Sequence, residues 1–156
     1  MTTNELIALL YKSFGKNSKA FNYSSKKAFE FSRHLNELNE TEKINMVLPL
    51  IEFPHVFVKY WGCIIALSHN ILKEKSIVTL LQIMDIDTKS FDKPLDLNVL
   101  KADIGSDLYD YKKYGVVRSY PEQYSYEPSD FPNYKFVIKH YKRKYKNLLI
   151  KSDVKK

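Results

Sequence analysis

Cysteine is nearly absent from this chain of 156 residues, and the single Cys63 excludes an internal disulfide and any zinc cluster built on cysteines. Glycine is scarce as well. The four glycines stand singly, so the chain has no glycine-rich loop of the kind that binds phosphates. The motifs Gly-x-Ser-x-Gly, His-Glu-x-x-His and Gly-x-Gly-x-x-Gly are also missing. We therefore predict a protein that is not an enzyme, with no catalytic residues and no cofactor.

Long apolar runs are missing too. No run approaches the ~18 residues that span a bilayer. The polar opening Met1–Glu5 has neither the basic flank nor the apolar stretch of a signal peptide. We expect a protein without a membrane span that resides in the cytoplasm. With 44% hydrophobic and 28% charged residues, the composition is typical of one globular domain, which we place at residues 1–150.

Metal-binding patterns are lacking among the histidines and the acids. The four histidines lie on four separate predicted segments, so none is placed to share a metal with another: His34, His55, His69 and His140. The acidic run that starts at Asp85 fails as a calcium loop, because Ser90 stands where such a loop needs glycine. We expect no metal site, acids that cap helices, and a Cys63 that behaves as a small buried apolar residue.

Positive charge is plentiful but unevenly spread. The net charge is +7, and residues 101–156 hold 13 Lys and Arg against 7 Asp and Glu. Residues 1–100 are almost balanced, with 12 against 11. A basic C-terminal third favours an acidic protein, a nucleic acid or an anionic surface as partner. Only three residues are arginine, the side chain suited to bidentate phosphate recognition, and the excess lysine is equally typical of a compositional bias.

Apolar residues recur at helical spacing along most of the chain, and no segment alternates like a strand, so the fold class is mainly α. Thr2, paired with Glu5, is expected to cap the first helix, and Gly15 to end it. Later helices are expected to begin at Ser24 or Ser25, at Thr41 and at Asp96, the last of them ending at Gly115. Pro49 is expected to kink or shorten the third helix. The expected core positions include Ala28, Phe31, Leu35, Leu38, Ile44, Val47, Leu48, Ile51, Ile77, Leu80, Leu81, Met84, Leu97, Leu100, Ile104, Leu108 and Tyr111.

The predicted helix over 56–69 is apolar nearly all round, which is typical of a buried helix. Trp61 shares a face with Val58 and Ile65 and is expected in the core. One contrasting face is small or polar, and it either admits a close neighbour or lines an open surface: Lys59, Gly62, Cys63, Ala66 and Asn70. On the second alternative Lys59 is a candidate binding residue.

The stretch Met46–Leu67 resembles a HEAT-type helical hairpin. A leucine-rich helix is followed by a short turn with Pro54, then by Val58-Lys59-Tyr60-Trp61 and small residues. The resemblance covers residues 44–111 and is to small bacterial HEAT-like domains of unassigned function. It implies antiparallel hairpins that stack on their neighbours, because one hairpin cannot bury both of its faces. An ordinary irregular helical bundle remains the alternative.

The C-terminal third differs in composition and residue pattern from the rest of the chain. Prolines interrupt residues 116–134 and predict an irregular segment rich in tyrosine. A short extended stretch is expected at 116–118. A basic helix is expected over 135–150, with Val137, Tyr141, Tyr145 and Leu148 on its apolar side, and a frayed tail over 151–156.

These observations lead to two hypotheses about function. The first is a cytoplasmic protein-binding module, which we specify as an immunity protein that blocks a bacterial toxin with an acidic surface by steric occlusion. The second is a helical-repeat protein that binds nucleic acid through the basic C-terminal helix. The candidate partner-binding residues are Lys59, Arg118, Tyr120, Tyr124, Tyr126, Lys139, Lys142, Arg143 and Lys146. The tyrosines have a third interpretation, in which they only cover the end of the helical stack.

Overall fold

The fold was obtained as a computed structural model, which describes residues 1–15, 18–115, 117 and 134–149. Every regular element within these residues is a helix, as the sequence predicts. The helices are α1 (Thr3–Ser13), α2 (Ser18–His34), η1 (Leu35–Glu37), α3 (Glu40–Glu52), α4 (Val56–Ser68), α5 (Lys73–Met84), η2 (Thr88–Ser90), α6 (Pro94–Tyr114) and α7 (Tyr134–Lys144).

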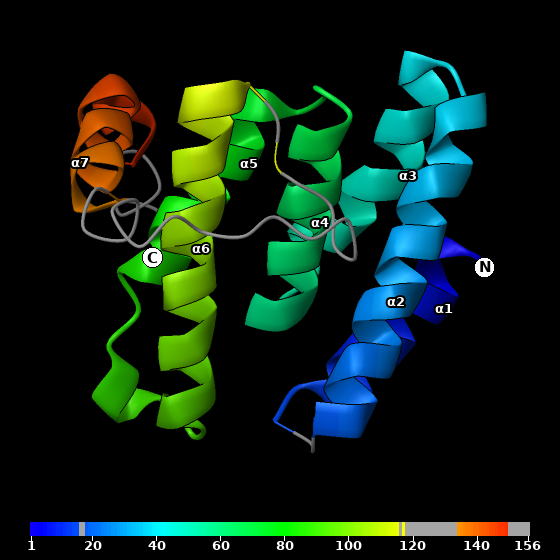
Figure 1. The fold of residues 1–156 in the computed structure, drawn as a ribbon, viewed down its shortest axis with the longest axis horizontal. Coiled ribbons are helices and arrows are strands. Elements are labelled where there is room, and N and C mark those ends of the chain that lie inside the picture. Colours follow the sequence, from blue (N-terminus) through cyan, green and yellow to red (C-terminus); the bar gives the residue numbers. More distant parts are fainter. Residues whose placement is uncertain (16–17, 116, 118–133, 150–156) are drawn as a thin grey trace.

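The helices stand side by side in a row, with α1, α2 and α3 at one end, α4 in the middle and α7 at the other end (Figure 1). Helices that follow one another in sequence pack together: α3 on α4, α4 on α5, α5 on α6 and α6 on α7. The mainly α prediction and the stacking of helical hairpins are therefore confirmed. Among the described residues, no helix combines the length and the apolar composition that a bilayer crossing requires.

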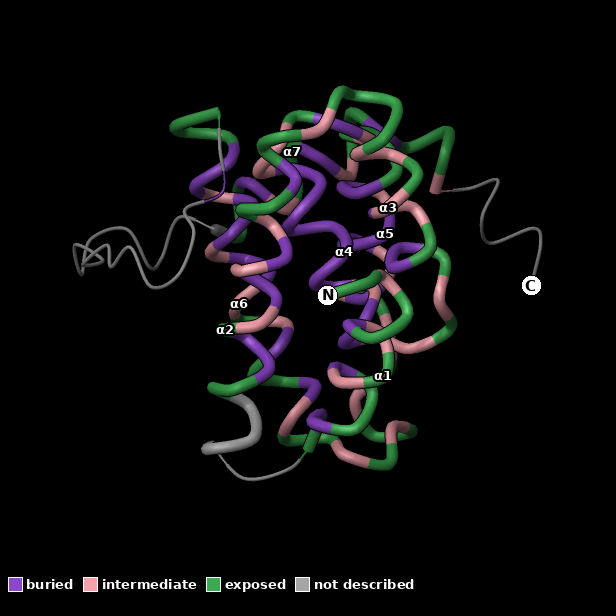
Figure 2. The backbone as a smooth tube through the Cα atoms, turned by 90° about the vertical axis from the view of Figure 1, so that its right-hand side faces the viewer, coloured by how far each residue is buried: buried purple, intermediate pink, exposed green. Residues whose placement is uncertain are grey.

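Helix α4 is the centre of the core, and it packs against α1, α2, α3, α5 and α6. Its buried positions run almost without interruption from Phe57 to Leu67 (Figure 2). Trp61 is only 6% exposed and meets Phe29 and Tyr60 edge to face, with ring centroids 5.5 and 5.6 Å away. The prediction that Trp61 belongs to the core is confirmed.

The small face of α4 admits close neighbours rather than lining an open surface. A Cβ atom on Gly62 would lie 2.8 Å from the backbone nitrogen of Ile51 in α3, so only glycine fits there. Cys63 is fully buried, with Ser76 and Thr79 of α5 near its thiol. The tight approach of α3 and α5 to α4 depends on these two small side chains.

Three of the predicted helix starts are wrong, and for two of them another start signal lies two residues earlier. Helix α2 begins at Ser18, which leaves Ser24 and Ser25 inside it as buried residues. Asn39, not Thr41, caps α3, since its side chain accepts from the Glu42 backbone N–H while Glu42 accepts from that of Asn39. Helix α6 begins at Pro94, whose fixed φ suits a first turn, so Asp96 falls within that turn.

Other boundary predictions fare better. The Thr2 side chain accepts a hydrogen bond from the Glu5 backbone N–H at 3.1 Å and caps α1 as predicted. Gly115 ends α6 with a φ of +77°, which is left-handed backbone that favours glycine. Pro49 does not shorten α3, which continues to Glu52. Pro49 and Asn45 are both exposed, so water can replace the hydrogen bond that the proline removes.

The predicted helix over 135–150 is interrupted by a turn at Tyr145. Val137, Tyr141 and Tyr145 are buried as predicted, but Leu148, which follows the turn, is 38% exposed. The irregular segment over 116–134 lies outside the described residues except for Val117, which is buried, and Tyr134 at the start of α7. The predicted tail over 151–156 lies outside them as well, and the single-domain boundaries stay a prediction.

Candidate binding surface

Helix α7 has two faces of opposite character. Val137, Tyr141 and Tyr145 turn inward and pack the helix against α6 and α5, with the rings of Tyr141 and Tyr145 stacked 6.2 Å apart. Burial raises the pKa of Tyr141 to about 12, so its hydroxyl stays neutral. The opposite face is exposed and carries Phe136, Lys139, His140, Arg143 and Lys144. These residues recur at i, i+3, i+4, i+7 and i+8, so one side of the helix presents them together.

The last turn of α6 adds two more cations beside this face. Lys112 and Lys113 precede the Gly115 cap and are both exposed. The ammonium group of Lys113 lies 5.5 Å from the ring centre of Tyr109 and 5.3 Å from that of Tyr114. At this distance each ring attracts the cation, so the end of α6 mixes positive charge with aromatic surface.

Two hollows lie along α7, and one of them also borders the end of α6. One, of about 350 Å³, is lined by Tyr109, Lys112, Lys113, Phe136 and Val137. The other, of about 500 Å³, is lined by Phe136, Lys139, His140, Arg143 and Lys144. Phe136 borders both hollows and is 72% exposed. We refer to the residues that line these two hollows as the basic groove.

Four cations of the basic groove have no acidic partner among the described residues. Within the residues that the structure describes, Lys112, Lys139, Arg143 and Lys144 form no ion pair. The pKa of His140 is lowered by desolvation and by the charges of Lys112, Lys144 and Arg143. Four cations from two helices therefore create a positive potential that is available to a ligand.

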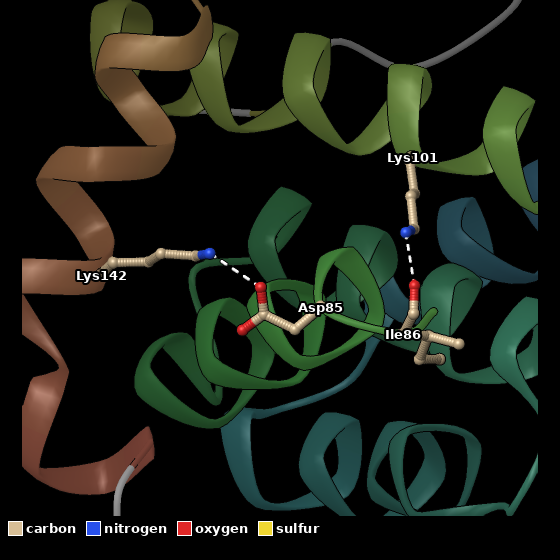
Figure 3. A network of polar contacts seen from close by, with 4 residues as sticks. All are labelled: Asp85, Ile86, Lys101 and Lys142. Atoms are coloured by element: carbon tan, nitrogen blue, oxygen red, sulfur yellow. Dashed lines mark hydrogen bonds and ion pairs between the residues drawn. The ribbon is translucent and has the colours of Figure 1, made fainter. Parts of the chain in front are cut away.

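The structure separates the basic residues that the sequence groups together. Lys139 and Arg143 line the basic groove, and Lys146 is exposed but does not line it. Lys142 turns toward the end of α5, where its amine donates to Asp85 at 2.7 Å (Figure 3). On α6, Lys101 donates to the Ile86 carbonyl, so lysines from two helices hold the link after α5 (Figure 3). Lys142 thus has an internal partner that the sequence does not reveal.

The remaining predicted binding residues lie elsewhere. Lys59 is half-buried, and its amine donates to the Ile51 carbonyl at 2.8 Å, where it satisfies the C-terminal end of α3. Burial lowers the pKa of Lys59. Lys59 therefore has a structural contact, and its role in binding stays a prediction. The other four candidates, Arg118, Tyr120, Tyr124 and Tyr126, lie outside the described residues.

Sequence reasoning missed most of the groove. Phe136, His140, Lys144, Tyr109 and the pair Lys112-Lys113 were not among the candidates, although they outnumber those that were found. A signal existed on α7, since Phe136 lies off the apolar stripe of Val137 and Tyr141 and at helical spacing from Lys139 and His140. No pattern in the sequence indicated that the end of α6 would lie beside α7.

The cysteine and two of the histidines, residue types that can act as nucleophiles or metal ligands, make contacts within the fold. Burial raises the pKa of the Cys63 thiol to about 12, so the reactive thiolate does not form at neutral pH. His69 bonds through Nε2 to the Ser32 carbonyl at 2.9 Å, and His55 packs on the rings of Tyr11 and Phe14. In the described parts of the chain, no three His, Cys, Asp or Glu side chains are arranged to hold a metal ion.

A row of buried carboxyl groups on α6 was also missed. Asp107 and Asp110 are buried, and Asp103 lies one turn before them. The hydroxyl of Tyr60 in α4 donates to Asp107 Oδ2 at 2.6 Å. Burial raises the pKa of Asp107 to about 8 and that of Asp103 to about 6. Asp107 is therefore largely protonated at neutral pH and joins α4 to α6 as a structural hydrogen-bonding group.

Comparisons with protein-family models, with curated proteins and with solved structures return no match for this chain. The function is therefore argued from the basic groove itself.

Proposed function

We propose that this protein is a non-catalytic binding module that docks an acidic protein partner on the basic groove. The observation that carries this proposal is the exposed ring of Phe136, which borders both hollows among four lysines and one arginine. Protein interfaces are built in this way, with an aromatic anchor at the centre of the contact and charged side chains at its rim. The net charge of +7 adds long-range attraction for an acidic partner.

The non-catalytic part of the proposal rests on the chemistry of the side chains. The one thiol is buried in the core, and the half-buried His55 ring packs on Tyr11 and Phe14. Neither group lies in the basic groove. A surface that binds without reacting acts by occupying its partner, and a stack of packed helices holds such a surface in place.

More specifically, we propose that the protein is an immunity protein, which inhibits a toxin by binding it. A HEAT-like stack of bacterial origin would bind a toxin encoded beside it and cover the toxin's active site. The basic surface argues against a basic nuclease as the target and favours a toxin domain with acidic exposed patches. Co-expression with such a neighbouring toxin tests this form, because protection should be lost when Lys139 and Arg143 are replaced by alanine.

Nucleic-acid binding is the second candidate, favoured by the aromatic rings of Phe136 and Tyr109 among lysines. Aromatic side chains stack with bases while cations follow the phosphate backbone of single strands. The groove contains one arginine, so such binding would be sensitive to salt and indifferent to sequence.

A photoreactive phenylalanine analogue placed at position 136 tests the proposal in cells of the source organism. Position 95 is a matched control, because Leu95 is 79% exposed but lies at the start of α6, away from the groove. We expect a crosslink to a protein from position 136 and none from position 95. A product that nuclease digests would favour the second candidate. Absence of any crosslink from position 136, or equal crosslinking from both positions, would contradict a binding role for the groove.

A further inference from the structure

The two hollows of the basic groove share a single apolar side chain. Phe136 borders both of them, with Lys112 beside it in the hollow toward α6 and Lys139 and Arg143 in the hollow toward α7. A ligand that crosses from one hollow to the other therefore meets a cation, an aromatic ring and a second set of cations in turn. This order of charge and apolar surface specifies the ligand more narrowly than net charge does.

The apolar centre requires an apolar group on the ligand. Covering the 72% exposed ring of Phe136 with apolar surface stabilises a complex, because it removes apolar area from water. A polyanion that only neutralised the lysines would leave this ring in water. The mixture of four lysines with one arginine is also less suited to bidentate phosphate contacts than an arginine cluster would be.

We propose, on the basis of the function proposed above, that the basic groove recognises a short acidic peptide segment of its partner with a central apolar side chain. That side chain packs on Phe136. Carboxylates before and after it in the segment contact Lys112 on α6 and Lys139 and Arg143 on α7. The groove thus selects a partner by the order of acidic and apolar residues in this segment.

Three fluorescent probes test this inference at about 0.15 M salt. One is a peptide with a single Phe between runs of Glu, the second replaces that Phe by Ser, and the third is a single-stranded oligonucleotide of equal charge. We expect the Phe peptide to bind about tenfold more tightly than the Ser peptide and than the oligonucleotide. Equal affinity for the two peptides, tighter binding of the oligonucleotide, or no peptide binding up to about 1 mM would each overturn the inference.

Variants of the protein locate the binding. Phe136→Ser should abolish the preference for the Phe peptide, because the peptide then has no ring to cover. Replacing Lys139 and Arg143 by Ala should weaken both peptides by a similar factor. Lys12→Ala with Lys89→Ala is the matched control, since it removes the same charge from exposed positions on α1 and η2. If this control weakens binding as much as the groove variant, the peptide senses net charge alone and the inference is wrong.

His140 supplies an independent signal from within the groove. Its pKa is held down in part by Lys112, Lys144 and Arg143, and the ring of Tyr141 lies 5.0 Å away. Carboxylates that dock on these cations should raise the pKa of His140, which NMR titration measures. A pKa that does not move on saturation with the Phe peptide would place the peptide elsewhere. A protein crosslink at position 136 without peptide selectivity would refute this inference alone, whereas a nucleic-acid crosslink would refute the proposed function as well.

Discussion

The centre of the molecule and its C-terminal end are held together by different chemistry. Around α4 the contacts are aliphatic, aromatic and close, with Gly62 against the α3 backbone and Trp61 against Phe29. Where α7 meets α6, the buried side chains include the tyrosines Tyr111, Tyr141 and Tyr145, and the outer face is basic. The centre is specialised for stability, while the end leaves an aromatic ring and several cations exposed. A binding surface can form at the C-terminal end because its exposed side chains are not fixed by close packing, as those around α4 are.

Trp61→Ala, in the centre of the molecule, should have the largest effect on stability. Loss of a buried indole and the cavity that it leaves should cost about 3–5 kcal/mol in the free energy of unfolding. Phe136→Ala is the matched change at the C-terminal end, and because Phe136 is 72% exposed we expect an effect within about 0.5 kcal/mol. Chemical denaturation of both variants measures the difference. Equal losses in the free energy of unfolding would show that the two regions do not differ in this respect.

Gly62→Ala should have the next largest effect. The added methyl group would lie 2.8 Å from the Ile51 backbone nitrogen and from Leu50 Cβ, so α3 and α4 would have to move apart. We expect a loss of about 1–3 kcal/mol in the free energy of unfolding. Cys63→Ala, one residue away, is the control for a small change in volume on the same helix. A Gly62→Ala variant as stable as the wild type would show that the approach of α3 to α4 is not tight.

The contact between Tyr60 and Asp107 joins the two regions and should make stability depend on pH. Because burial raises the pKa of Asp107 from 3.8 to about 8, the folded state binds this proton more tightly than the unfolded state does. The resulting stabilisation is complete below pH 3.8 and is lost as the pH rises to about 8. Asp103 acts in the same direction up to about pH 6.

Asp107→Asn tests this dependence, since the amide keeps an oxygen for the Tyr60 hydroxyl and does not ionise. We expect the Tm of the variant to fall less than that of the wild type between pH 5 and about pH 8. Thermal denaturation across this range measures the difference. Parallel curves for the two proteins would mean that Asp107 does not hold a proton in the folded state.

The smallest effects are expected on the outside of α7. Lys142→Ala removes the ion pair with Asp85, but both side chains are about half exposed, so the loss should stay below about 1 kcal/mol and shrink in high salt. Lys139→Ala, which breaks no ion pair with a described residue, should leave stability unchanged within about 0.5 kcal/mol. Urea denaturation at low and high salt compares them. A larger loss for Lys139→Ala would show that the groove contributes to stability.

Local patterns predicted the helices well because helical periodicity reports which side of a helix is apolar. The stripe from Leu97 through Ile104 to Tyr111 is buried as expected, and Thr2 and Gly115 mark helix ends through their own backbone chemistry. The errors at Thr41 and Asp96 arose because a competing start signal, Asn39 or Pro94, stands two residues earlier. The ranking of such signals depends on the hydrogen bonds that each makes, as the reciprocal pair of Asn39 and Glu42 shows.

The candidate site was predicted only in part. Lys139 and Arg143 line the basic groove, whereas Lys142, one residue from Arg143, is paired with Asp85 from a segment 57 residues earlier. The residues near Lys142 in the sequence do not indicate this pairing. The buried carboxyl of Asp107 was equally invisible, since an aspartate beside an apolar stripe normally faces water.

The sequence by itself determined that this protein is helical, where some helices begin and end, and which stripe of most helices is buried. These properties follow from interactions between residues a few positions apart. Only the tertiary structure decided that the end of α6 lies beside α7, so that Lys112 joins Lys139 and Arg143 around Phe136. It also decided that Lys59 and Lys142 have internal partners. The physical reason is that charge acts through space, and packing alone sets which distant residues become neighbours.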